Sequence, residues 1–402
     1  MKLLNEFENL IKGQGCFYLF DEDKFISNIS RFKQSFTEHG ININIGYSFK
    51  TNYAPKICQI AKDNDCWAEV VSSMEYQLSE KLNFNNRVIL NGPLKEDDTI
   101  VMVGKNGGII HVDTIDEFNR ILELSIINNI CIKIAIRLNF IDGDLPFSRF
   151  GIQDEEMIHQ IISKSKQTPN INLIGFHIHY PGRSIDTFIK RCELLYEYIV
   201  KFQNAFEISY LSFGGGFYSE PDSHLNSMFK GKLPTFNDYA RNMAIWMKKI
   251  NAMLGNVHFF IEPGTAVVAN TMDFYSRLYS YKRVDGIGIA TLWGSVYNIT
   301  GNSRGSNFPF EVIKTDEKAV KFETNMLVGY TCIESDIFNR SLSVKLSLSD
   351  VIVFKNVGSY SIVFKPPFIL PNCPVFVRGK SGLSLLKRAE NFEDIFNTYI
   401  FS

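Results

Sequence analysis

The sequence predicts an α/β fold: a (β/α)8 TIM barrel followed by a mostly antiparallel β domain. From about residue 40 to residue 265, short apolar runs alternate with helical patterns, and the number of such units favours a closed barrel over an open, doubly wound sheet. After Gly264, turn signals become frequent, and the apolar runs become short and alternate with polar residues. This second pattern is typical of half-exposed strands in an antiparallel sheet.

Eight runs are expected to form the barrel strands. Several are continuous stretches of Val, Ile and Leu, as in parallel strands that are buried on both faces. Amphipathic stretches between the runs predict the covering helices, for example 114–124 and 186–203, and Thr114 with Glu117 predicts a capping box. The strand runs are residues 41–49, 66–71, 87–91, 108–112, 131–138, 172–179, 208–213 and 257–261.

The domain boundaries are expected where the pattern changes. Residues 25–265 are assigned to the barrel, and residues 1–24 together with 266–402 to the β domain. The run 16–20 predicts a strand that precedes the barrel and is able to join it, whereas Ser341–Ser349 alternates with period two and predicts a half-exposed strand. A chain of 402 residues is longer than one core usually serves, which agrees with two domains.

The composition limits the classes of partner and compartment. The net charge of −1 offers no electrostatic attraction to nucleic acid or to an anionic membrane, and no apolar run reaches the ~18 residues of a spanning helix. The first residues are acidic where a signal peptide is basic and then apolar. Seven scattered cysteines without a C-x-x-C pair argue against a disulfide framework or a zinc site. We therefore expect a cytoplasmic protein that binds neither nucleic acid nor membrane.

Polar residues and glycines gather where the predicted barrel strands end, and this rim carries the active site in barrels of this kind. Taken singly they mean little, because Lys50 alone is typical of an exposed strand end and a glycine run is typical of a tight turn. Taken together they are difficult to explain as core residues. The rim positions are Lys50 after the first strand, Glu69 in the second, Asn91 in the third, Arg137 in the fifth, His179 in the sixth, Gly214, Gly215 and Gly216 after the seventh, and Glu262 after the eighth.

These residue types match the parts needed to hold pyridoxal 5'-phosphate (PLP). Lys50 supplies an amine that can bond to an aldehyde, and we expect an apolar pocket around it that eases the loss of its proton. The N–H groups of Gly214–Gly216 can approach a phosphate closely. The carboxylate of Glu262, which follows a buried run, suits a protonated pyridine nitrogen.

Two histidines supply the candidate stacking ring. His177 and His179 point to opposite faces of a regular strand, so they form a poor chelating pair, and no metal site is expected. One ring is expected to face the barrel centre and the other to pack under a helix. His179 lies nearer the rim and is the candidate for stacking on the cofactor.

Cys332 is the one cysteine that we interpret as functional. Glu334 and Asp336 follow it closely and are expected to raise its pKa, which would keep the thiol protonated. A protonated thiol suits a proton donor more than a nucleophile. The commoner role of a cysteine is that of a small buried side chain.

At this point the motifs resemble those of the alanine-racemase-fold (fold type III) PLP-dependent decarboxylases, the family of diaminopimelate and ornithine decarboxylases. The resemblance covers about residues 15–375. It implies a decarboxylase of a small amino-acid-like substrate, and a head-to-tail homodimer in which Cys332 reaches the active site of the partner subunit. It also implies that Gly264 and Tyr360 help to bind the cofactor, while Arg137 and Glu69 support its ring. The matching segments are Tyr47–Asn52, Ala68–Glu75, Ser148–Gly151, Gly175–His179, Gly214–Gly216, Glu262–Gly264, Cys332 and Gly358–Tyr360.

The departures from this family lie on the substrate side. Thr265 stands where the family usually has an arginine, the segment after His179 reads Tyr180–Arg183 in place of Gly-Ser, and Ile333 separates Cys332 from the first acid. The arginine-proline motif of the family is also missing from Ala290–Tyr297, and Ser303–Phe310 resembles relatives that act on unusual or carrier-bound amino acids. The candidate substrate contacts are Arg183, Arg304, Glu334 and Asp336.

The prediction is thus a decarboxylase of a non-standard amino acid, in specialised or secondary metabolism, whose substrate is free or held by a carrier protein. An amino-acid racemase of the same fold is the first alternative. It needs two opposed bases, commonly a lysine and a tyrosine, and the cysteine motif argues against it. The second alternative is a non-catalytic regulator or PLP carrier. A decarboxylase-like inhibitor has no need of Lys50, Glu262 and Cys332, and a small PLP carrier would lack the β domain.

Overall fold

The computed structural model describes residues 9–11, 13–140, 143, 147–220, 232–299 and 307–401. The chain divides into two compact units. The barrel unit comprises Ile26–Pro221 and Leu233–Val267, and the β unit comprises Met1–Phe25, Asp222–Lys232 and Val268–Ser402.

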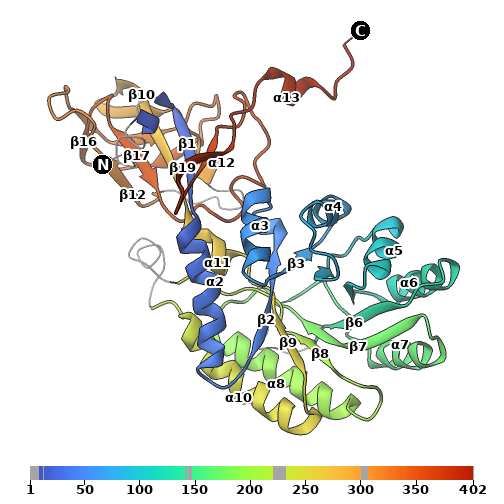
Figure 1. Ribbon diagram of the computed structural model, residues 1–402. Coiled ribbons are helices and arrows are strands. Elements are labelled where there is room, and N and C mark those ends of the chain that lie inside the picture. Colours follow the sequence, from blue (N-terminus) through green and yellow to red (C-terminus); the bar gives the residue numbers. More distant parts are fainter. Residues whose placement is uncertain are drawn as a thin grey trace. The chain divides into compact units, whose positions relative to one another are not determined.

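The barrel unit contains a closed barrel of eight parallel strands, which confirms the predicted fold class (Figure 1). Each strand pairs with the next along the chain, and the pairing of the first with the last closes the ring. The strands are β2 (Ile43–Ser48), β3 (Trp67–Val70), β4 (Val88–Leu90), β5 (Ile109–Val112), β6 (Ile132–Leu138), β7 (Ile171–Ile178), β8 (Tyr210–Ser212) and β9 (His258–Ile261).

Helices surround the barrel strands on the outside (Figure 1). Their apolar residues recur at helical spacing, so that each helix presents one stripe to the barrel. Among the described residues, no helix is both long and apolar enough to cross a membrane. The helices are α2 (Glu22–Thr37), α3 (Pro55–Asp63), α4 (Ser73–Lys81), α5 (Asp97–Lys105), α6 (Ile115–Ile127), α7 (Glu155–Gln167), α8 (Ile185–Phe202) and α10 (Phe236–Leu254).

The predicted capping box at α6 is only half formed. The Thr114 hydroxyl accepts a hydrogen bond from the N–H of Glu117 at 3.1 Å, as expected of an N-cap. The Glu117 carboxylate, however, accepts the N–H of Asp113 at 2.7 Å and also pairs with Lys95 at 2.6 Å. The buried ammonium of Lys95 thus draws the glutamate away from the cap.

The inside of the barrel is built in layers. Side chains alternate between the two faces of a strand, so residues two apart share the inward face. One apolar layer consists of Ile89, Ile109, Ala135, Tyr210 and Phe260, with Trp67 packed against it. Two residues further along these strands, the chain changes from apolar to polar side chains. This polar layer consists of Glu69, Asn91, His111, Arg137, Ser212 and Glu262, together with His177 of β7.

The β unit is a mostly antiparallel sheet, as the sequence predicts. Its main path runs β15-β14-β11-β10-β1-β18-β19, and β17 pairs with both β10 and β12. The pairs β1–β18 and β11–β14 are parallel, and the other pairs are antiparallel. The strands are β1 (Cys16–Asp21), β10 (Met272–Val284), β11 (Ile287–Leu292), β12 (Phe310–Ile313), β14 (Met326–Val328), β15 (Ile337–Asn339), β17 (Val351–Phe354), β18 (Val375–Gly379) and β19 (Gly382–Lys387).

The structure shows where two predicted strands pair. The N-terminal strand β1 pairs with β10 and β18 of the β unit and does not join the barrel. Within Ser341–Ser349 only β16 (Val344–Leu346) forms a strand, and it pairs with β13 (Phe322–Thr324) in a separate two-stranded sheet.

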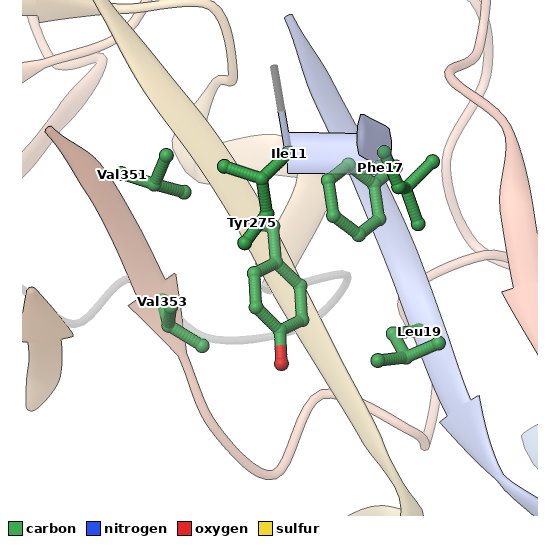
Figure 2. Close-up of a cluster of buried hydrophobic side chains, with 7 residues drawn as sticks. Ile11, Phe17, Leu19, Tyr275, Val351 and Val353 are labelled. Carbon is green, nitrogen blue, oxygen red and sulfur yellow. The ribbon is translucent and has the colours of Figure 1, made fainter. Parts of the chain in front are cut away.

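The core of the β unit lies between β1, β10 and β17 (Figure 2). The rings of Phe17 and Tyr275 stack with centroids 4.8 Å apart. Val351 and Val353 of β17 pack beside them, and Leu10 and Ile11 complete the cluster from the segment that precedes β1. The short helices of this unit are α11 (Thr265–Val268), which begins in the barrel unit, α12 (Val296–Ile299) and α13 (Phe392–Phe396).

Candidate active site

Lys50 lies in a short 3₁₀ helix, η1 (Phe49–Thr51), that continues β2. Its ammonium is 2.8 Å and 3.0 Å from the two carboxylate oxygens of Glu69 in β3. The side chain of Lys50 is 44% exposed, whereas that of Glu69 is fully buried and also accepts a hydrogen bond from Ser48. The prediction of an apolar pocket around the Lys50 amine is therefore wrong, because the Glu69 carboxylate contacts this amine and orients it.

Glu262 follows β9 and is 6% exposed. Its carboxylate accepts hydrogen bonds from Ser212 Oγ at 2.6 Å and from Asn91 Nδ2 at 3.0 Å. The same amide nitrogen of Asn91 donates to Glu69 at 2.9 Å, so one side chain joins the two buried carboxylates. Hydrogen-bond donors of this kind make a buried carboxylate tolerable.

His111 and His177 stack on each other inside the barrel, with ring centroids 4.3 Å apart. Burial lowers the pKa of both imidazoles well below the ordinary value, so both are neutral at pH 7. His177 Nε2 lies 3.3 Å from a Glu262 oxygen, and neither ring nitrogen of His177 makes a hydrogen bond within the described residues. His177 is thus the histidine that faces the barrel centre.

These two histidines and Glu262 bring possible metal-ligand atoms within 4.8 Å of one another. Both ring nitrogens of His111 are already engaged, however, with Asn91 Oδ1 at 2.6 Å and with the Tyr210 hydroxyl at 2.8 Å. A metal would have to break these bonds, so the geometry favours a hydrogen-bonded support for Glu262 over a metal centre.

His179 lies just beyond β7, beside the glycine run. Its Nδ1 accepts the N–H of Gly215 at 3.0 Å, and burial lowers its pKa well below the ordinary value, as do the charges of Arg191 and Arg137. The N–H of Gly214 is also engaged, with Ser212 Oγ at 3.3 Å. Within the described residues, the N–H of Gly216 has no acceptor, so it is the donor of the three that remains available for an anion.

Each position of this run requires glycine, either for its backbone conformation or for lack of space. Gly214 and Gly216 have positive φ angles of 65° and 96°, which only glycine adopts readily. A Cβ on Gly215 would lie 2.5 Å from the carbonyl oxygen of Glu262. The loop therefore packs its backbone against the residues that carry the site.

Arg137 lies in β6 and is 7% exposed. Its Nη1 is 3.4 Å from Asp113 Oδ1, and its guanidinium lies 4.6 Å from the centroid of the Phe150 ring. Its Nε is buried and has no hydrogen-bond partner among the described residues. Burial lowers the pKa of this guanidinium, although Asp113 opposes the shift.

In the β unit, Cys332 and Glu334 are exposed between β14 and β15. Asp336 is 2% exposed, and its carboxylate accepts hydrogen bonds from Ser295 Oγ at 2.9 Å and from Thr331 Oγ1 at 2.7 Å. Asp336 therefore shapes the loop that carries Cys332, and the structure favours this role over the predicted substrate contact.

The remaining predicted site residues lie in different parts of the structure. Gly264 allows η1 to approach, because a Cβ there would lie 2.2 Å from Thr51 Cγ2. Tyr360 is half-buried in the β unit with a φ of 61°. Arg183 is half-buried before α8, with its guanidinium 5.5 Å from the centroid of the Tyr218 ring. Arg304 lies outside the described residues.

A comparison with protein families shows which family the barrel belongs to. A family model described as "Pyridoxal-dependent decarboxylase, pyridoxal binding domain" matches residues 22–269. The chain belongs to this family. It is a PLP-dependent amino-acid decarboxylase, and PLP is its cofactor.

Relatives of this decarboxylase agree with the family. A rice (Oryza sativa subsp. japonica) protein described as "Probable diaminopimelate decarboxylase, chloroplastic" is 21% identical over 397 residues, which cover 94% of this chain and 78% of the rice protein. The fold resembles the solved diaminopimelate decarboxylase of M. jannaschii in complex with L-lysine (TM-score 0.87, 20% identity, 98% of this chain and 94% of that one). It also resembles the arginine decarboxylase of Paramecium bursaria Chlorella virus bound to agmatine (TM-score 0.72, 18% identity, 90% of this chain and 96% of that one).

The residues of the polar layer fit the cofactor of this family. The Nε of Arg137 and both ring nitrogens of His177 are buried polar atoms without hydrogen-bond partners among the described residues, as expected where a polar ligand binds. The glycine run presents an unengaged N–H at Gly216, and a backbone that no Cβ obstructs. The decarboxylase thus has an amine, a carboxylate and a glycine run with an unengaged N–H on one rim.

Two supporting residues of the decarboxylase were missed in the sequence. His111 lies in the apolar run Ile109–Asp113, and a lone polar residue in such a run is the signal that could have revealed it. Arg191 lies on α8 and is completely buried. A cation in an amphipathic helical pattern is typical of the exposed face of a helix, so no sequence signal marked Arg191.

Proposed function

We propose that this decarboxylase removes the α-carboxylate of a non-standard amino acid related to diaminopimelate or ornithine. The observation that carries the proposal is the arrangement of Lys50, Glu69 and Glu262 on one barrel rim, joined through Asn91. The diaminopimelate and arginine decarboxylases among its relatives support an amino acid with a polar far end. The altered substrate side, with Thr265 and the segment Tyr180–Arg183, supports a substrate outside the common set.

When bound, the cofactor supplies an aldehyde for an amine and a ring that accepts the electrons of the Cα–carboxylate bond. Lys50 would provide the amine for this aldehyde, and Glu69 holds that amine in place. Glu262 would hold a proton at the ring nitrogen, and hydrogen bonds from Ser212 and Asn91 orient its carboxylate. The neutral ring of His179 offers a flat apolar face for stacking.

The second half of the chemistry is a proton return. We assign this step to the exposed thiol of Cys332, which donates a proton to the substrate Cα after carbon dioxide has left. We place this thiol in the active site of the partner subunit of a homodimer, with Tyr360 near the cofactor phosphate. A lone subunit would then be inactive.

Arg183, Arg304 and Glu334 are the proposed contacts for the substrate. A guanidinium binds a carboxylate or phosphate with two parallel hydrogen bonds, so Arg183 suits an anionic group on the substrate or on a carrier protein that presents it. We also propose a reducing, cytoplasmic compartment, which the scattered cysteines without a C-x-x-C pair support, and a role in specialised metabolism there.

The test is mass spectrometry of the PLP-loaded protein in deuterated water with a panel of basic, acidic, diamino-diacid and carboxylated-polyamine substrates. We expect one of them to lose carbon dioxide and gain one deuteron at Cα. Deuterium at Cα with the carboxylate retained would instead identify a racemase and would remove Cys332 from its assigned step. A Lys50→Ala protein serves as the control and should show neither change.

A further inference from the structure

Arg191 is a buried cation behind the glycine run. It extends from α8, and its side chain is completely buried. Its Nη1 donates to the carbonyl oxygen of Gly215 at 2.9 Å, and its Nη2 donates to the carbonyl oxygens of Tyr180 and Gly182, each at 2.5 Å. One guanidinium thus joins the glycine run to the segment that follows His179.

No carboxylate neutralises this charge within the part of the chain that the structure describes. Its hydrogen bonds go to main-chain carbonyl groups, and its guanidinium lies 4.2 Å from the centroid of the Phe188 ring. Burial lowers the pKa of Arg191 to about 10, which still leaves it charged at neutral pH. An uncompensated buried charge is unfavourable, so an anion is expected close to it.

The geometry indicates where this anion binds. A Cβ on Gly216 would lie 3.5 Å from Arg191 Nη2, so the guanidinium is directly behind that residue. The carbonyl of Gly215 points toward Arg191, and in a trans peptide the following N–H points the opposite way. That N–H belongs to Gly216, the donor that has no acceptor among the described residues. The hydrogen bond from Arg191 therefore aims the free N–H of Gly216 away from the helix.

We propose that Arg191 is the positioning residue of the phosphate cradle: it aims the Gly216 N–H at the phosphate and supplies from behind the loop the positive charge that a phosphate dianion needs. It thereby compensates for Thr265, which occupies the position of an arginine in the family. Arg191 acts through the loop, so it does not touch the substrate. This inference rests on the proposed role of Gly214–Gly216 as the phosphate site.

The test compares PLP with pyridoxal, which lacks the phosphate, as ligands of the apo protein. Dissociation constants are measured by titration of cofactor absorbance for the wild type, Arg191→Met and Arg191→Lys. We expect Arg191→Met to weaken PLP binding about tenfold or more and pyridoxal binding less than about threefold, with Arg191→Lys in between. A Lys201→Met variant, which removes a solvent-exposed cation of the same helix, should leave both affinities unchanged.

A second readout is the ³¹P resonance of bound PLP as a function of pH. The charge of Arg191 favours the dianion, so the phosphate of the Arg191→Met protein should take up its proton at higher pH than that of the wild type. Equal losses of PLP and pyridoxal affinity, with an unchanged ³¹P titration, would reduce Arg191 to a structural residue. If Arg191→Met does not fold, the same comparison of PLP affinity with pyridoxal affinity is made for Arg191→Lys, and a larger loss for PLP supports the proposal. If the wild type itself binds PLP no tighter than pyridoxal, the proposed phosphate site fails, and the inference with it.

Discussion

The ammonium of Lys50 lies 2.8 Å from a carboxylate oxygen of Glu69, whose side chain is fully buried. The parallel pairing of β2 with β3, in which Ser48 is the partner of Glu69, creates this contact. The position of the amine at the barrel rim therefore depends on a residue of the neighbouring strand.

Replacing Glu69 by Gln should destabilise the apo protein. The change removes the charge that pairs with Lys50 and turns an amide N–H toward the donors Asn91 and Ser48. We expect a loss of about 1–3 kcal/mol in the free energy of unfolding, because a buried acceptor is lost while Lys50 remains partly solvated. Urea unfolding measures it, with Glu123→Gln, on the exposed side of α6, as the control. A loss below about 0.5 kcal/mol would contradict the stabilising role of Glu69.

Replacing Glu262 by Gln should impair turnover more than cofactor binding. The amide cannot hold a proton at the ring nitrogen, and we expect kcat to fall about 10²-fold or more. The affinity for PLP should change much less, since the glycine run is untouched. Steady-state kinetics and PLP titration of one preparation separate the two effects. Equal losses in both would mean that Glu262 only maintains the fold.

The buried carboxyl group of Glu75 should make the free energy of unfolding depend on pH. It is 4% exposed in α4 and accepts the N–H of Val71 at 2.8 Å, and burial raises its pKa to about 7. The folded state thus binds this proton more tightly than the unfolded state, so stability is full at low pH and falls as pH rises from about 4.5 to 7. The loss should be about 3 kcal/mol, since each pKa unit corresponds to about 1.4 kcal/mol.

The check is urea unfolding of the wild type and Glu75→Gln at pH 5 and pH 8. The glutamine keeps an acceptor for Val71 and has no charge, so the variant should match the wild type at pH 5 and exceed it at pH 8. Glu38→Gln, at an exposed site, controls for general charge effects. An equal difference at both pH values would contradict the assignment.

Two inactive variants should complement each other if the sites are shared. In a mixed dimer of Lys50→Ala and Cys332→Ala subunits, one of the two sites contains neither substitution. After subunit exchange, we expect about a quarter of the wild-type activity, the value for random pairing with one intact site in each mixed dimer. Absence of activity in a mixture whose exchange has been verified by mass spectrometry would contradict the shared site.

The sequence was informative where one residue type dominates a segment. Continuous apolar runs predicted all eight barrel strands, and the polar residues that end them predicted the rim. Contacts between strands were harder to predict from the sequence. The Lys50–Glu69 pair, for example, depends on the register of β2 and β3. Buried polar residues in apolar patterns, such as His111 and Arg191, resemble surface residues when only spacing is known. Asp336 was interpreted as a substrate contact because it follows Cys332 closely, and its hydrogen bond from Ser295, which is distant in the chain, could not be read from spacing.

The most direct test of the account is the site of cofactor attachment. The PLP-loaded protein is reduced with sodium borohydride, digested and mapped by mass spectrometry, with Lys50→Arg as the matched control. We expect one phosphopyridoxyl group on the peptide that contains Lys50, and none in the variant. A label on another lysine, or an unchanged label in Lys50→Arg, would contradict the assignment of the β2 rim as the active site.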